Sequence, residues 1–322
     1  MVERTRAMTR RALHPIAPEP VAAPGLSIGR RSVLLAVACL PVLLFAGWLL
    51  LRELRPAARL ALPLGPPADE AALLHMPTAT ATVYPFAPAP DILVALFPSL
   101  HTQALALNRV GVFVEKAGMP RTRVLDDAAL ARAIAAAGDD FDSFYFGHDY
   151  RAADLARFFA TADAGHIALR PEEEALRRLL ADRGMLAPGA RGAFISLPPI
   201  STSPDVDAAE RATILRHELS HGLYFTDPTY AAYTQSFWAG LTAVQRARFR
   251  AFLASDGYDT SNDDLMRNET QAYLVHTADA RFFNAASAGI DAPTLGRLRA
   301  QFVAGMPDDW LRRRTPMTAS EK

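Results

Sequence analysis

A long uncharged stretch near the N-terminus is the strongest constraint on how this chain can fold. Residues 32–51 read SVLLAVACLPVLLFAGWLLL and contain no charged side chain. A helix of twenty residues rises about 30 Å, which matches the hydrocarbon core of a bilayer. Uncharged apolar runs of this length are typical of membrane spans, so the stretch predicts a single transmembrane helix.

The flanking charges predict the orientation of this helix. Residues 1–31 carry six arginines and two glutamates. Positively charged flanks stay in the cytoplasm, so residues 1–31 form a cytoplasmic tail and the chain after Leu51 lies in the periplasm or outside the cell. A cleaved signal peptide is the alternative. The run is longer than a usual signal core and no small-x-small cleavage site follows it, so we expect an uncleaved anchor in the inner membrane.

Charge and cysteine content exclude several classes of function. Basic and acidic residues balance at 34 each, and no basic patch interleaved with aromatic residues is present, which argues against nucleic acid as a partner. The single cysteine, Cys39, excludes an intramolecular disulfide and any zinc site built from cysteines.

Beyond the anchor, the sequence divides into four parts. Residues 52–90 are rich in proline and alanine and predict a linker. Residues 91–201 mix strand-like and helical patterns, residues 202–313 are predicted to be helical, and residues 314–322 form a tail. This order predicts an α+β fold with segregated parts. The predicted strands are 110–115, 141–146, 166–170 and 192–197, and the predicted helices between them are 126–137, 150–161 and 171–183. In the last of these, Glu172–Glu174 follow Pro171, where carboxylates stabilise the start of a helix.

Residues 216–225, RHELSHGLYF, carry the clearest chemical motif. Asp207 and Glu210 have the spacing of a capping box, and no proline follows until after Phe225, so one helix should hold His217 and His221. Residues four apart share a helical face, which lets both imidazoles reach one cation.

Two neighbours of the histidines complete this motif. Glu218 points about 100° away from His217, where it can flank a metal without binding it. Gly222 is expected to leave space beside His221.

The pentapeptide His217-Glu218-Leu219-Ser220-His221 resembles the active-site helix of the zincin metallopeptidases. A shuffled chain of this composition would contain the pattern roughly once in a hundred cases, so a third ligand is needed. The metzincin extension is absent because Tyr224 and Asp227 occupy its positions.

In the gluzincin branch the third ligand is a glutamate on a later helix, in a setting similar to Asn268-Glu269-Thr270-Gln271-Ala272. The resemblance therefore implies a Zn²⁺ ion held by His217, His221 and Glu269, with Glu218 as general acid/base. It also implies a zincin-like domain, with a small mixed sheet and the active-site helix followed by a helical part.

Further residues near these motifs are candidates for a part in catalysis or substrate binding. Tyr273 and His276 share a helical face with Glu269 and could stabilise an oxyanion, although packing is the alternative. The strand at 192–197 is expected to lie beside the cleft and to pair with an extended peptide.

Several other polar residues are assigned structural roles. Capping or turn formation is favoured over a carboxylate–histidine contact for three aspartates, and two histidines lack a partner at metal spacing. The aspartates are Asp227, Asp263 and Asp264, and the histidines are His148 and His166.

Together these features predict a membrane-anchored, zinc-dependent metallopeptidase that hydrolyses peptide or protein substrates with metal-activated water. Two alternatives stay open: a zinc-dependent hydrolase of a non-peptide amide, and a catalytically inactive zincin-like binding module.

Overall fold

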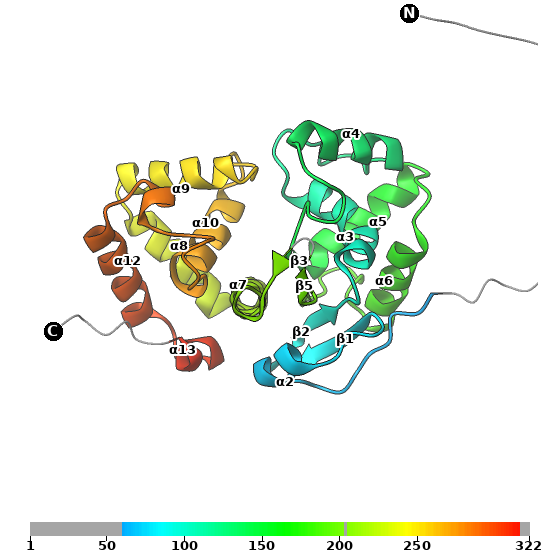
Figure 1. Ribbon diagram of the computed structural model, residues 1–322, viewed down its shortest axis with the longest axis horizontal. Helices are drawn as coiled ribbons and strands as arrows, with labels where there is room; N and C mark the ends of the chain where they lie inside the picture. The colour runs from blue at the N-terminus through cyan, green and yellow to red at the C-terminus, as the bar shows by residue number, and fades with distance from the viewer. Residues whose placement is uncertain (1–59, 203–204, 316–322) are drawn as a thin grey trace, which may run out of the picture. The chain divides into compact units, whose positions relative to one another are not determined.

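A four-stranded mixed sheet lies at the centre of the N-terminal half (Figure 1). The computed structural model describes residues 60–202 and 205–315. Counted in spatial order across the sheet, the first and second strands are antiparallel, the second and third are parallel, and the third and fourth are antiparallel. In spatial order they are β1 (Thr82–Phe86), β2 (Ala89–Leu96), β4 (Ala193–Leu197) and β3 (His148–Arg151). A separate two-stranded ribbon follows, made of β5 (Ser201–Thr202) and β6 (Asp205–Val206).

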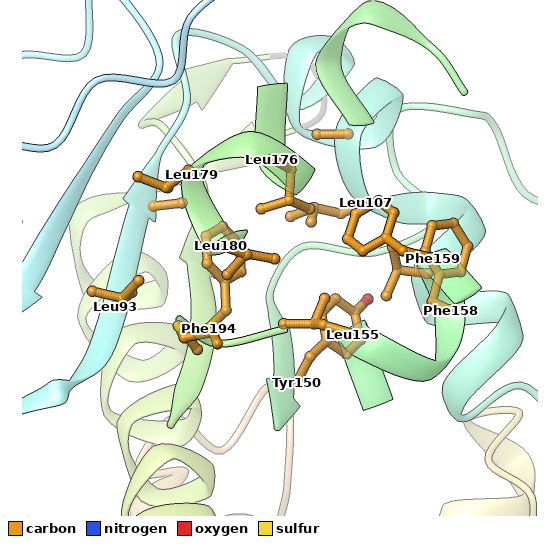
Figure 2. Packing of buried hydrophobic residues seen from close by; sticks show 14 of the residues in the cluster. Leu93, Leu107, Tyr150, Leu155, Phe158, Phe159, Leu176, Leu179, Leu180 and Phe194 are labelled. Carbon is orange, nitrogen blue, oxygen red and sulfur yellow. The ribbon is translucent and has the colours of Figure 1, made fainter. Parts of the chain in front are cut away.

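Three helices cover one face of this sheet. Leu93 of β2 and Phe194 of β4 point into the cluster they form, and Phe158 packs there without exposed surface (Figure 2). Alternate residues of the same strands, such as Val94 and Ile195, are buried on the opposite face. Burial on both faces explains why β2 and β4 read as continuous apolar runs. The three helices are α3 (Leu100–Val114), α5 (Ala152–Ala164) and α6 (Pro171–Asp182).

The opposite face of the sheet supports α7 (Ala208–Thr226), the helix with the histidine pair. Asp207 and Glu210 form the predicted reciprocal capping box at its start. Gly222 faces the sheet rather than His221: a Cβ there would lie 2.9 Å from two side-chain carbons of Ile92. The expectation that Gly222 makes room for His221 is therefore wrong, since its missing side chain lets α7 approach β2 closely.

The C-terminal third consists of helices that pack against the side of α7 that faces away from the sheet. Figure 1 shows α7 almost end-on, between these helices and the sheet. Tyr230, Phe249 and Phe302 are fully buried in their shared core. These helices are α8 (Pro228–Gly240), α9 (Ala243–Ser255), α10 (Asp263–Gln271), the π-helix η1 (Ala272–His276), α11 (Ala285–Ala288), α12 (Ala292–Gly305) and α13 (Trp310–Arg314).

The described chain is thus a mixed α+β fold with a small mixed sheet and many helices. No helix in its described ranges is long and apolar enough to cross a bilayer. The predicted span, residues 32–51, lies outside those ranges, as does the predicted cytoplasmic tail.

The predicted linker over 52–90 is wrong from residue 60 onward. This part contains α2 (Glu70–His75) and β1, and Leu73 and Phe86 are fully buried against the sheet and α7. Proline at position 85 is tolerated because β1 is an edge strand.

Three predicted strands are also wrong. Residues 110–115 lie mostly in α3, whose largely buried surface makes a helix read like a buried strand. Residues 141–146 and 166–170 form turns and loops. The predicted strand at 192–197 and the predicted helix at 171–183 are confirmed to within one residue, as β4 and α6. The predicted helix at 126–137 is also confirmed to within one residue, as α4 (Asp127–Ala137). The helix at 150–161 begins later, because Tyr150 belongs to β3.

Candidate metal centre

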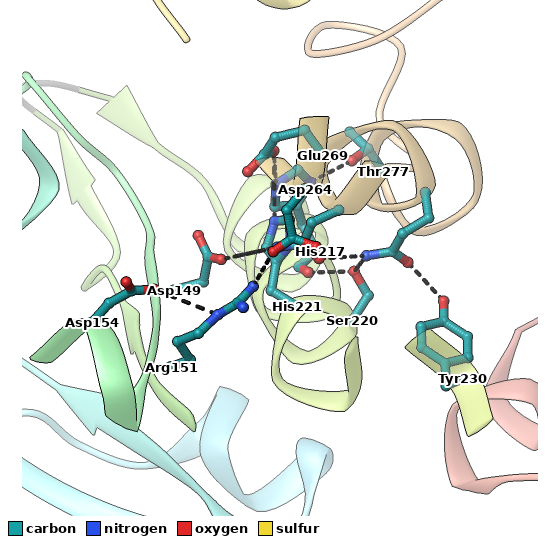
Figure 3. A network of polar contacts seen from close by, with 12 residues as sticks. Asp149, Arg151, Asp154, His217, Ser220, His221, Tyr230, Asp264, Glu269 and Thr277 are labelled. Atoms are coloured by element: carbon teal, nitrogen blue, oxygen red, sulfur yellow. Dashed lines mark hydrogen bonds and ion pairs between the residues drawn. The ribbon is translucent and has the colours of Figure 1, made fainter. Parts of the chain in front are cut away.

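Three predicted ligands meet where α7 crosses α10. The Nε2 atoms of His217 and His221 lie 3.7 Å and 3.6 Å from Oε2 of Glu269. One ligand atom from each residue lies within 4.8 Å of the other two, so a single cation can contact all three. Figure 3 shows the two imidazoles and the carboxylate turned toward one another.

Two further side chains approach the second ring nitrogen, Nδ1, one beside each imidazole. Nδ1 of His217 lies 2.8 Å from the Thr277 hydroxyl, and Nδ1 of His221 lies 3.7 Å from Oδ2 of Asp149. The hydrogen bond with Thr277 orients the His217 ring and selects the ring nitrogen that faces Glu269. Asp149 is too far from Nδ1 of His221 for a hydrogen bond and can act on that ring only through its charge. Both rings present Nε2 to Glu269.

The polar atoms between these side chains have the chemistry of a metal site. His221 Nε2 and both carboxylate oxygens of Glu269 are buried without a hydrogen-bond partner in the described chain. Such atoms are costly unless something satisfies them. Two imidazole nitrogens and a carboxylate oxygen match the ligands of catalytic zinc sites. The residues therefore fit a zinc ion.

Burial keeps the two histidines in the form that binds metal. It lowers the pKa of His217 to about 3 and that of His221 to about 4, the latter against the opposing effect of Glu269. Both rings are neutral at pH 7, as metal binding requires. Burial also raises the pKa of Glu269, although His221 and the Tyr258 hydroxyl act in the opposite direction.

Glu218 lies beside this centre and lines a pocket of about 250 Å³. Its Oε2 is buried and unpartnered in the described chain, and burial together with the nearby charge of Glu269 raises its pKa well above the usual range. Gly147, just before β3, touches the same carboxylate: a Cβ there would lie 2.0 Å from Oε1 of Glu218. The absence of a side chain at Gly147 thus makes room for Glu218.

The two other candidates for catalysis lie in different places. Tyr273 lines the pocket, and its ring centroid is 4.7 Å from that of His217. His276 does not line the pocket and instead places Nε2 3.2 Å from the Tyr230 hydroxyl inside the helical core. We therefore no longer assign His276 a catalytic role. The α-helical spacing from Glu269 was misleading because η1 widens the turn, and Thr277 faces His217 instead.

The aspartates and the histidine with predicted structural roles make specific contacts. Asp227 caps α8, as expected, and Asp263 pairs with Arg250. Asp264 accepts a hydrogen bond from the Tyr224 hydroxyl at 2.6 Å and pairs with Arg151. His148 is buried in β3, with Nδ1 2.8 Å from the Ser196 hydroxyl, in agreement with a structural role.

Sequence analysis missed two buried carboxylates at this centre. Asp149 approaches His221 from β3, and Glu115 ends α3 within ligand distance of Asp149 and Glu269. Burial raises the pKa of Glu115 to about 8, with a further contribution from Glu269. Neither residue has a local spacing that signals a metal, although Asp149 directly follows a histidine that was considered.

A short backbone bridge closes one side of the pocket. The N–H of Ala117 donates to the carbonyl of Gly257, and the N–H of Asp259 donates to the carbonyl of Glu115, both at 3.0 Å. We call residues 115–117 and 257–259 the rim bridge. Arg121 reinforces it with a 3.2 Å contact to the Asp259 carboxylate.

Comparison with protein-family models, with curated proteins and with solved structures finds no match to this chain. The geometry of the centre and the sequence motif therefore carry the functional interpretation.

Proposed function

We propose that this protein is a zinc-dependent hydrolase of gluzincin type, and that its substrates are peptides or proteins. The observation that carries the proposal is the convergence of His217, His221 and Glu269 on one point, with the Glu218 carboxylate beside them in a pocket. Histidines four apart are common in helices. A buried glutamate that meets both of them from a helix about fifty residues later is much harder to explain as packing.

The side chains around the pocket have distinct tasks in this proposal. Zinc, when bound, polarises a substrate carbonyl and makes water a stronger nucleophile near neutral pH. Glu218 accepts the proton of the attacking water and passes it to the leaving amine. Its raised pKa in this buried position suits a group that must both take and return a proton. Tyr273, on the pocket wall beside His217, is placed to donate a hydrogen bond to the developing oxyanion.

The cellular setting is proposed from the N-terminal sequence. The uncharged run at 32–51 anchors the protein in the inner membrane, and the arginines before it keep the N-terminus in the cytoplasm. The hydrolytic domain then acts on the periplasmic or extracellular side.

A second candidate function has a specific observation in its favour. Four residues of the rim bridge line the pocket, namely Glu115, Lys116, Gly257 and Tyr258, and Glu115 also lines a neighbouring polar pocket. We infer that this bridge hinders an extended polypeptide from passing the metal centre on this side. This arrangement favours a chain end, a short peptide or a small non-peptide amide.

The test uses the purified full-length protein in detergent. We expect one zinc per chain, and we expect Glu218→Gln to keep that zinc while hydrolysis of a peptide library falls by more than about 100-fold. Glu174→Gln, an exposed glutamate on α6, is the matched control and should retain both zinc and activity. His217→Ala should lose the zinc.

The outcomes separate the candidates. Zinc content near zero in the wild type would refute the metal centre. Cleavage of short peptides or amides but not of intact unfolded proteins would favour the second candidate. Zinc binding with no hydrolysis of either class would leave the inactive binding module.

A further inference from the structure

Three buried carboxylates meet next to the proposed zinc ligands, each from a different element. Glu115 ends α3, Asp149 lies in β3 and Glu269 lies in α10. One oxygen atom from each residue lies within 4.8 Å of the other two. Two oxygen ligands of one Ca²⁺ ion, each about 2.3–2.6 Å from it, are at most about 5 Å apart, so the three oxygens can share a cation of this size.

The partners of these carboxylates do not account for their burial. Glu115 is 6% exposed, and no side chain in the described ranges donates a hydrogen bond to its carboxylate. Glu269 has only the Tyr258 hydroxyl as a nearby donor, and neither of its oxygens forms a hydrogen bond of ordinary geometry within the described ranges. Asp149 receives only a long 3.5 Å contact from Asn268 besides the 3.7 Å approach of His221. Buried carboxylates without donors ordinarily bind a cation or a proton.

The carboxylates at this centre carry, when all are ionised, more charge than one zinc ion can neutralise. Glu115, Asp149, Glu218 and Glu269 supply four carboxylates, whereas zinc supplies two positive charges and its histidine ligands are neutral. Against the larger effect of burial, Lys116 and Arg121 act to lower the pKa of Glu115, and Arg151 acts to lower that of Asp149. Within the described ranges, however, none of these cations forms an ion pair with either carboxylate. Arg151 pairs with Asp264 and Asp154, and the ammonium of Lys116 lies 4.4 Å above the Phe144 ring.

A water-accessible route leads to the same carboxylates. A second pocket of about 200 Å³ is lined by Glu115 and Asp149 together with further polar side chains such as Asp154 and Asn262. Hard divalent cations keep water molecules among their ligands, which a polar pocket of this size accommodates. The pocket that contains Glu218 is lined by Glu115 as well.

We propose that Glu115, Asp149 and Glu269 form a second cation site, selective for a hard divalent ion such as Ca²⁺ or Mn²⁺. An all-oxygen ligand set distinguishes it from the nitrogen-rich zinc site. Glu269 belongs to both sites and bridges the two ions through its carboxylate. The inference rests on the proposed function only through this shared residue.

Mn²⁺, which is visible by electron paramagnetic resonance, is the probe. The zinc-loaded full-length protein in detergent is equilibrated with Mn²⁺, and the two metals are counted separately. We expect one zinc and one Mn²⁺ per chain, with Ca²⁺ displacing the Mn²⁺. Glu115→Gln should keep the zinc and weaken Mn²⁺ binding by at least about 10-fold, as expected for loss of a ligand. Retained zinc shows that the variant is folded.

The controls keep the two sites apart. Asp154→Asn removes a carboxylate from the second pocket that is not a proposed ligand, and it should bind both metals as the wild type does. His217→Ala should lose zinc and keep Mn²⁺, so failure of the zinc proposal alone would leave the second site visible. Zinc binding without any Mn²⁺, or Mn²⁺ affinity unchanged by Glu115→Gln, would overturn the inference and leave protons as the partners of these carboxylates.

Discussion

Gly147→Ala tests whether the Glu218 carboxylate must occupy its observed position. The added Cβ would lie 2.0 Å from Oε1 and 2.7 Å from Cδ of Glu218, well inside ordinary contact distance. The φ angle of Gly147 is not in the left-handed region, so the backbone accepts alanine. The main obstacle is the Glu218 carboxylate, and Cγ2 of Ile214, 3.0 Å from the new Cβ, is a lesser one. The carboxylate must therefore move by more than about 1 Å.

The expected loss follows from that displacement. A misplacement of about 1 Å near reacting groups lowers rates by about 100-fold, equivalent to about 2.7 kcal/mol of transition-state stabilisation. We expect kcat/KM for a quenched-fluorescence peptide to fall by this factor while zinc content stays at the wild-type level. Gly240→Ala makes the same chemical change where no atom lies within 4 Å of the new Cβ, and it should leave kcat/KM unchanged.

Two results would contradict this reasoning. Wild-type kcat/KM in zinc-loaded Gly147→Ala would show that Glu218 need not occupy its observed position. Loss of zinc together with activity would show that the substitution disturbs the ligands and not the acid/base alone.

Three further perturbations test the fold around the centre. Gly222→Ala should destabilise the protein by about 1–3 kcal/mol in urea unfolding, because the new Cβ meets Ile92 at 2.9 Å, and an unchanged midpoint would contradict the close packing of α7 on β2. Glu173→Ala leaves the buried guanidinium of Arg109 without its hydrogen-bonded carboxylate, with only Asp127 at 3.9 Å, and should cost about 3–5 kcal/mol. Glu172→Ala, at a partly exposed neighbour, should cost under about 0.5 kcal/mol. Burial lowers the pKa of His148 to about 3, so below pH 6.5 the unfolded chain binds the proton more readily and stability decreases as the pH is lowered toward 3. Between pH 6 and pH 4, His148→Gln should lose about 1.4 kcal/mol less per pH unit than the wild type, and parallel slopes would refute this assignment.

Local patterns in the sequence predicted the helices of the centre well. The capping box at Asp207 and the four-residue spacing of His217 and His221 depend only on neighbours along the chain, and α7 follows both. Glu269 was found because its setting resembles a known motif.

Residues that reach the centre from distant elements could not be predicted in the same way. Asp149 and Glu115 contribute through the position of β3 and the end of α3, which depend on how the sheet packs on α7. Thr277, and not His276, reaches the centre, because the turn of η1 is wider than that of an α-helix. No local sequence pattern predicts this wider turn. The role of Gly147 depends on Glu218, which is adjacent to it in space but far from it in the sequence.

The segments that meet at this centre are widely separated along the chain. Glu115 and Thr277, which both lie there, are 162 positions apart in the sequence. An incompletely synthesised or unfolded chain offers only the two histidines of one helix, which bind a metal weakly, so the complete ligand set exists only after both halves have folded together. The compartment in which folding finishes is therefore also the one that must supply the metal. If that compartment lies beyond the inner membrane, the metal content of the protein will follow the supply there and not the cytoplasmic pool.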